Sequence, residues 1–162
     1  MSNAAKKFFD GVDAIADKSG KIFCYLVFII MLITTMDVVA RYVFNHPLLW
    51  GWVLNRQLFG VFILFAGVYT LYTGGHIRIE IFYDLFGPKA KTIARFLSLA
   101  AFLGFMGVLL RQTIWMGLNS LQMKEKVGGA FRIPLYPFKL LIPVVVLLFL
   151  LVGISAFRRG KD

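Results

Sequence analysis

The sequence predicts an all-α integral membrane protein with four transmembrane helices, and both its composition and its pattern of apolar residues support this. Hydrophobic residues make up 59% of the 162 residues and charged residues 16%, with a mean hydropathy of +0.78. A soluble domain carries about 25% charged residues and about half apolar ones at most. Four apolar stretches are also long enough to cross roughly 30 Å of bilayer hydrocarbon as helices.

The N-terminal segment, residues 5–20, predicts an amphipathic helix that lies in the membrane interface. Phe8, Val12 and Ile15 fall at helical spacing on one side, and charged residues occupy much of the rest of the helix surface. The alternative interpretation is a frayed polar tail. This segment and the four spans together make a single membrane domain over residues 1–162.

The first two spans are predicted at residues 22–44 and 50–73. The first contains thirteen Ile, Leu, Phe and Val residues, and their insertion free energy of roughly 4 to 8 kcal/mol exceeds the cost of one Asp and one Arg. Trp50 and Trp52 open the second span. Aromatic rings at such a position are typical anchors at the headgroup level.

The last two spans are predicted at residues 96–118 and 135–157. Trp115 and Tyr136 lie near the same membrane surface as the tryptophans of the second span, so they are predicted to be interfacial anchors as well. Pro143 lies deeper in the fourth span and predicts a kink there.

An even number of spans places both termini and the loop between the second and third spans on one side of the membrane. That side carries eleven basic residues, whereas the two opposite loops carry Lys124, Lys126 and Arg132. Cytoplasmic loops are enriched in Lys and Arg. The sequence therefore predicts that both termini are cytoplasmic.

Four charged residues lie inside the predicted spans: Asp37, Arg41, Arg56 and Arg111. Asp37, Arg56 and Arg111 lie about 10 Å below the outer surface, and Arg41 lies near the end of its span, on the same helix face as Asp37. A charge at mid-depth costs about 2.5 to 3.5 kcal/mol on insertion scales. In one interpretation Arg41 and Arg56 extend to lipid phosphates and Arg111 pairs with Asp37. In the other, a second membrane subunit supplies carboxylates or backbone carbonyls to the whole group.

The other polar residues favour no catalytic, metal or cofactor site. Cys24 is the single cysteine, so disulfide chemistry within the chain is excluded. Haem ligation by two histidines is not expected, because His46 and His76 both lie in loops. His76 and Glu80 would give a metal only two ligands. The excess of 18 Lys and Arg over 8 Asp and Glu indicates contact with membrane phospholipids rather than nucleic acid.

Several motifs occur in a specific order along nearly the whole chain. They are the run from Asp37 to Pro47, Trp50 with Arg56, the loop from Gly75 to Glu80, and Ile133 to Pro137 with Pro143. In these motifs the sequence resembles the small membrane subunit (DctQ-like) of tripartite ATP-independent periplasmic (TRAP) transporters. One departure is the stretch from Gly51 to Asn55, where the family commonly carries acidic residues.

The resemblance implies a non-enzymatic subunit of a sodium-coupled transporter in the bacterial inner membrane. In this family a large multi-span subunit moves organic acids such as C4-dicarboxylates or sialic acid, and a soluble periplasmic protein delivers them. The small subunit braces the stationary part, and the four charged residues inside the spans are expected to make structural or subunit contacts. His46, Lys124 and Lys126 in the outer loops are candidates for contact with the periplasmic protein, with plain solvated turns as the alternative.

A different class of function stays open on the sequence alone. The chain could form a small homo-oligomeric channel or exporter, with the group of arginines lining an anion path. The sequence also leaves open whether the four helices form a compact bundle or a splayed row.

Overall fold

The computed structural model describes residues 3–75, 87–127 and 132–158. These residues form five helices: α1 (Asn3–Cys24), α2 (Leu26–Tyr42), α3 (Gly51–Thr73), α5 (Pro88–Gln122) and α6 (Tyr136–Arg158). Outside the helices, the described residues contain only an isolated β-bridge between Lys126 and Pro134. Four stretches of helix are long and apolar enough to cross a membrane, so the prediction of an all-α membrane protein is confirmed.

The N-terminal segment is a helix, as predicted, and the alternative of a frayed tail is wrong. Helix α1 runs almost in line into α2, with a short break at Tyr25, so that residues 7–42 form one long rod with an apolar stretch long enough to cross a membrane. The face that packs carries Val12 and Ala16, which are buried, whereas Phe8 and Ile15 are exposed. The helix is therefore packed against its neighbours, and its placement in the membrane interface stays a prediction.

The other helix boundaries follow local backbone chemistry. Helix α3 ends at Gly74, whose φ of +74° is the left-handed conformation that glycine adopts without strain. Helix α5 begins with Pro88, where the missing amide hydrogen costs nothing. Helix α5 thus starts eight residues before the predicted span 96–118. The basic residues in this stretch are too polar for the hydrocarbon layer, but they are compatible with a helix.

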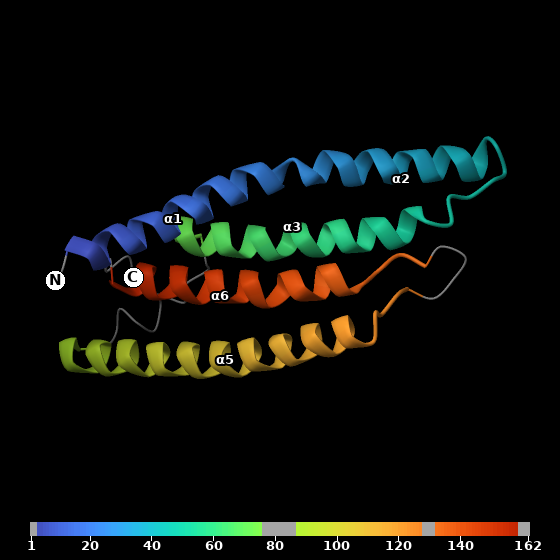
Figure 1. Ribbon diagram of the computed structural model, residues 1–162. Coiled ribbons are helices and arrows are strands. Elements are labelled where there is room, and N and C mark those ends of the chain that lie inside the picture. Colours follow the sequence, from blue (N-terminus) through green and yellow to red (C-terminus); the bar gives the residue numbers. More distant parts are fainter. Residues whose placement is uncertain (1–2, 76–86, 128–131, 159–162) are drawn as a thin grey trace.

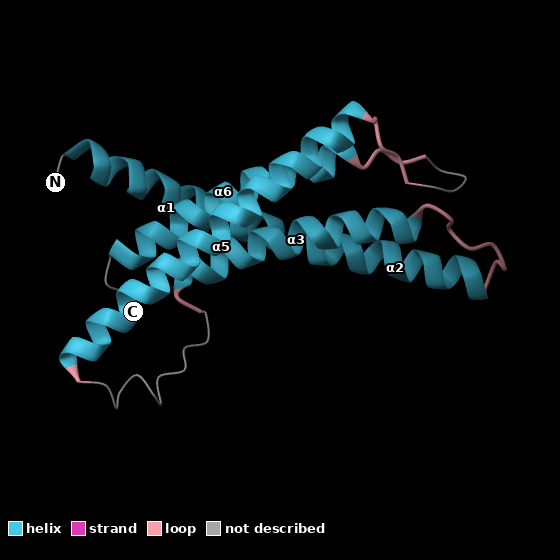
Figure 2. Ribbon diagram, turned by 90° about the horizontal axis from the view of Figure 1, so that it is seen from below, coloured by secondary structure: helices cyan, strands magenta, loops and turns pink. Residues whose placement is uncertain are grey.

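The helices lie in a row and not in a compact bundle (Figure 1). Helix α3 packs against α1, α2 and α6, and α6 in turn packs against α5. Helix α1 also contacts α6 directly, so the row is more than one helix thick where α1, α3 and α6 meet. Figure 2 shows that the row is splayed, because the ends of α2 and α3 at the 43–50 loop lie apart from the ends of α5 and α6 at the 123–135 loop. The arrangement is thus one helix thick over much of its width.

The buried core lies where α1, α3 and α6 meet. Its fully or nearly buried residues are Val12, Ala16, Phe65, Val68, Val145 and Val152. The rings of Phe23 and Phe65 stack beside it with centroids 3.8 Å apart. Both termini lie at this end of the molecule, and the 43–50 and 123–135 loops lie at the opposite end (Figure 1). This agrees with the predicted pairing of termini and loops, while the side that faces the cytoplasm stays a prediction.

Candidate functional site

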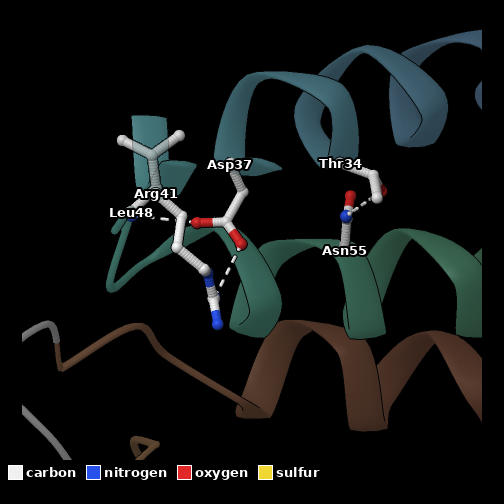
Figure 3. A network of polar contacts seen from close by, with 5 residues as sticks. All are labelled: Thr34, Asp37, Arg41, Leu48 and Asn55. Carbon is white, nitrogen blue, oxygen red and sulfur yellow. Dashed lines mark hydrogen bonds and ion pairs between the residues drawn. The ribbon is translucent and has the colours of Figure 1, made fainter. Parts of the chain in front are cut away.

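Asp37 is the centre of a polar network near the end of α2 (Figure 3). Its Oδ2 accepts a hydrogen bond from Arg41 Nη2 at 3.0 Å, and its Oδ1 accepts one from the backbone amide of Leu48 at 2.9 Å. Arg41 lies one helical turn along α2, at the i,i+4 spacing that the sequence indicates. The carboxylate thus fixes the 43–50 loop to the helix that precedes it.

A second polar contact joins α2 to α3 further from the loop. Asn55 Nδ2 donates a hydrogen bond to Thr34 Oγ1 at 2.8 Å, and the Thr34 hydroxyl donates to the carbonyl of Ile30 at 2.7 Å (Figure 3). Hydrogen bonds between membrane helices of this kind are worth about 0.6 kcal/mol on average. Sequence reasoning missed this pair, although a polar side chain in each of two adjacent spans was the available signal.

Arg56 stands apart from the Asp37 network. Its guanidinium carbon lies 5.2 Å from the centroid of the Trp52 ring, a geometry in which the ring face attracts the cation. Both side chains are exposed, whereas Trp50, at the N-terminal end of α3, is half-buried. Of the predicted anchors, Trp115 is also exposed and Tyr136 is half-buried.

Arg111 does not pair with Asp37, so that prediction is wrong. Arg111 is exposed on α5, at the far end of the row from α2, and it forms no ion pair with any residue that the structure describes. Asp37 already has a cation one turn away in Arg41. The four charges inside the predicted spans therefore form no single network within this chain.

The 123–135 segment begins and ends as a short antiparallel pair. The amide of Val127 donates to the carbonyl of Ile133, and the amide of Leu135 donates to the carbonyl of Glu125, both at 2.9 Å. Lys139 Nζ reaches back from α6 to Glu125 Oε2 at 2.5 Å. The Lys139 ammonium lowers the pKa of the Glu125 carboxyl below its ordinary value, and this contact ties the loop to α6.

The three outer-loop candidates all lie at the end of the molecule opposite the termini. His46 is in the 43–50 loop and donates its backbone amide to the carbonyl of Ala40 at 3.0 Å. Lys124 and Lys126 are in the 123–135 segment, and all three side chains are exposed. Because the two loops diverge (Figure 2), the three residues form no single compact patch.

The described residues contain no group of three or more His, Cys, Asp or Glu side chains that could hold a metal ion. The pair His76 and Glu80, considered above as an incomplete metal site, lies outside the described residues, as does most of the Gly75 to Glu80 motif. Cys24 is exposed and free. The polar residues of this site hold helices and loops in place, and their exposed charged side chains can contact another molecule.

Comparison with protein families gives a match over most of the chain. The model of the family described as "Tripartite ATP-independent periplasmic transporters, DctQ component" matches residues 30–161. That range begins within α2 and includes α3, α5 and α6, so α1 lies outside it. No curated protein matches the sequence significantly.

Proposed function

Because the chain belongs to the DctQ component family of tripartite ATP-independent periplasmic transporters, we propose that it braces the large membrane subunit of such a transporter as part of the stationary assembly. Membership makes it a small membrane subunit of a transporter in the inner membrane, not an enzyme. The partners in this proposal are a large multi-span subunit, a periplasmic substrate-binding protein and the surrounding phospholipids.

The row of helices is the observation that carries this proposal. A layer that is largely one helix thick encloses no pathway of its own, and it leaves broad apolar faces on α2 and α5 exposed. Such a layer suits a brace that lies along a larger membrane protein. Exposed Trp52 and Trp115 would resist movement of the row across the membrane, since indole rings favour the headgroup level.

The finer parts of the proposal concern transport itself. We infer that the complex carries an organic acid, such as a C4-dicarboxylate or sialic acid, and that sodium drives the uptake. The substrate site would then lie on the other subunits. His46, Lys124 and Lys126 are exposed at the end opposite the termini. The proposal takes this end to face the periplasm, where these residues would contribute to docking of the substrate-binding protein.

Affinity purification tests the bracing role. The tagged chain is extracted from its native membrane in mild detergent, and the proteins that come with it are identified by mass spectrometry. A stoichiometric large multi-span protein is expected, and that pair, reconstituted in vesicles with its periplasmic protein, should take up the organic acid only with an inward sodium gradient. Recovery of the 18.4 kDa chain alone, or only as a homo-oligomer, would contradict the proposal.

The alternative of a homo-oligomeric channel has less support. It required the arginines to line one path, but Arg56 lies on α3 and Arg111 on α5, at the far edge of the row. Within one chain these two side chains lie on helices that are separated by α6, which packs against both.

A further inference from the structure

One side of α5 combines small residues with a charge. Ala100, Gly104, Gly107 and Arg111 follow one another at spacings of three or four residues and so share a helix face, called here the Arg111 face. All four are exposed, and a Cβ built on either glycine meets nothing within 4 Å. The opposite side of α5 packs on α6, where Gly117 lies against the backbone of Lys139.

The charge of Arg111 distinguishes this face from an ordinary lipid-facing surface. Among the described residues, Arg41 has Asp37, Arg56 has the Trp52 ring and Lys139 has Glu125. Arg111 has no such partner there, and its position seven residues before the end of the predicted span 96–118 places it about 10 Å below the outer surface. A cation at such depth needs an acidic or polar partner.

The small residues indicate what kind of molecule supplies that partner. Glycine and alanine at spacings of three or four residues let a second helix backbone approach closely, and this packing drives helix association in membranes. The space that the missing side chains of Gly104 and Gly107 leave open, called here the hollow, lies on the same helix face as Arg111. The small residues therefore allow a second helix to approach closely, and the positive charge suits an acidic side chain on that helix.

We propose that the Arg111 face seats a transmembrane helix of the large subunit, and that a carboxylate on that helix pairs with Arg111. This inference rests on the proposed function, because it assumes the large subunit. A second copy of this chain fits less well, since a two-fold contact on the same face would bring the two arginines together. A lipid phosphate would satisfy the charge but would leave the hollow beside the glycines unused.

Matched variants in the native membrane test the proposal. Arg111→Leu removes the charge, and Gly107→Leu fills the hollow. Each is expected to lower the yield of co-purified large subunit by about tenfold, as expected for loss of a strong contact between membrane helices. Arg111→Lys should retain most of it. The controls are Gln112→Leu, an exposed neighbour that points about 100° away, and Gly11→Leu, whose Cβ also meets open space.

The outcomes separate the two proposals. If the wild-type chain brings no large subunit, the proposed function fails. If it does, and Arg111→Leu and Gly107→Leu bring as much as the controls do, only the Arg111 face is overturned. The unfolding temperature of each purified variant alone should not fall below that of wild type, since Arg111 is exposed and a Cβ at Gly107 meets nothing within 4 Å.

Photocrosslinking gives an independent measurement. A benzophenone amino acid at Gly107 should crosslink to the large subunit, and one at Met106, which is buried within the chain, should not. Crosslinks from Gly107 only to lipid, only to a second copy of the chain, or to nothing at all would overturn the proposal.

Discussion

Asp37 connects the end of α2 to the loop that follows, because each of its carboxylate oxygens has a different donor. The Arg41 guanidinium is exposed, and such a pair contributes little by itself. The Leu48 amide lies eleven residues away along the chain, and it is left without this acceptor if the carboxylate is removed. The structural importance of Asp37 therefore comes mainly from the backbone bond.

We expect Asp37→Ala to lower the free energy of unfolding by about 1 to 3 kcal/mol, the cost of leaving a partly buried donor unsatisfied. Asp17→Ala is the matched control, because Asp17 also accepts from a cation at i+4, Lys21, and has no backbone bond of this kind. Its effect should be below about 0.5 kcal/mol. Unfolding of both variants is measured in detergent by circular dichroism, and equal losses would contradict this role of Asp37.

The Glu125 and Lys139 pair makes the order of the 123–135 segment depend on pH. Because Lys139 holds the pKa of Glu125 below its ordinary value of 4.5, the pair stabilises the folded segment fully above that value. The stabilisation is lost as the pH falls through the lowered pKa. Hydrogen exchange of the Val127 and Leu135 amides, corrected for the intrinsic rate, should therefore accelerate in acid. In Glu125→Gln, protection should be weaker at neutral pH and independent of pH over this range.

The sequence identified some of these residues and missed others for a physical reason. The Asp37 and Arg41 pair follows from helical periodicity alone, since i and i+4 always share a face. Pairs across a loop, such as Glu125 with Lys139, depend on the path of the chain between helices. The mistaken pair of Asp37 with Arg111 has the same cause, because equal depth in the membrane does not show which helices are neighbours.

At the scale of elements, the backbones of α5 and α6 lie close together at Gly117. A Cβ added there would lie 3.1 Å from the backbone carbonyl oxygen of Lys139, and a backbone atom cannot turn aside as a side chain can. This close contact holds α5 against α6, which is its main neighbour in the row.

We expect Gly117→Leu to force α5 and α6 apart and to lower the free energy of unfolding by about 1 to 3 kcal/mol, as overpacking does. Gly104→Ala on the same helix is the control, since its Cβ meets open space. It should change the stability of the isolated chain little, or raise it by up to about 1 kcal/mol through helix propensity. A double-cysteine distance measurement by electron spin resonance across α5 and α6 would show a shift in the first variant alone.

Helix α1 shows what periodicity can and cannot predict about an element. Its existence follows from the spacing of apolar residues, but the packed face does not, because Phe8 and Ile15 are exposed whereas Phe23 packs on the core. Small residues and a polar contact add to the packing of Phe23. Ala16 is fully buried, and Ser155 donates a hydrogen bond to Asp13 at 2.9 Å inside the junction with α6.

For the whole molecule, the number of spans was predictable and the order of the helices in the row was not. Hydropathy reports only that each helix faces an apolar environment, and lipid and protein neighbours satisfy that condition equally. Short loops would also have allowed a compact bundle. The row follows from side contacts such as that of α3 with α6, which no local pattern encodes.

The orientation of the row follows from the distribution of charge between its two ends. In the sequence, eleven basic residues fall in the terminal segments and the connection between the second and third spans, and three fall in the other two loops. Because anionic lipids and the insertion machinery keep basic loops in the cytoplasm, the end with the 43–50 and 123–135 loops should face the periplasm.

Cysteine labelling tests this orientation on the whole chain. In a Cys24→Ser background, Met123→Cys places an exposed thiol beside the outer loop, and Asp10→Cys places one on α1 near the N-terminus without removing a basic residue. A membrane-impermeant maleimide added to spheroplasts should label Met123→Cys at once and Asp10→Cys only after lysis. The reverse order would mean that charge does not set the orientation, and it would place His46, Lys124 and Lys126 in the cytoplasm, out of reach of any periplasmic protein.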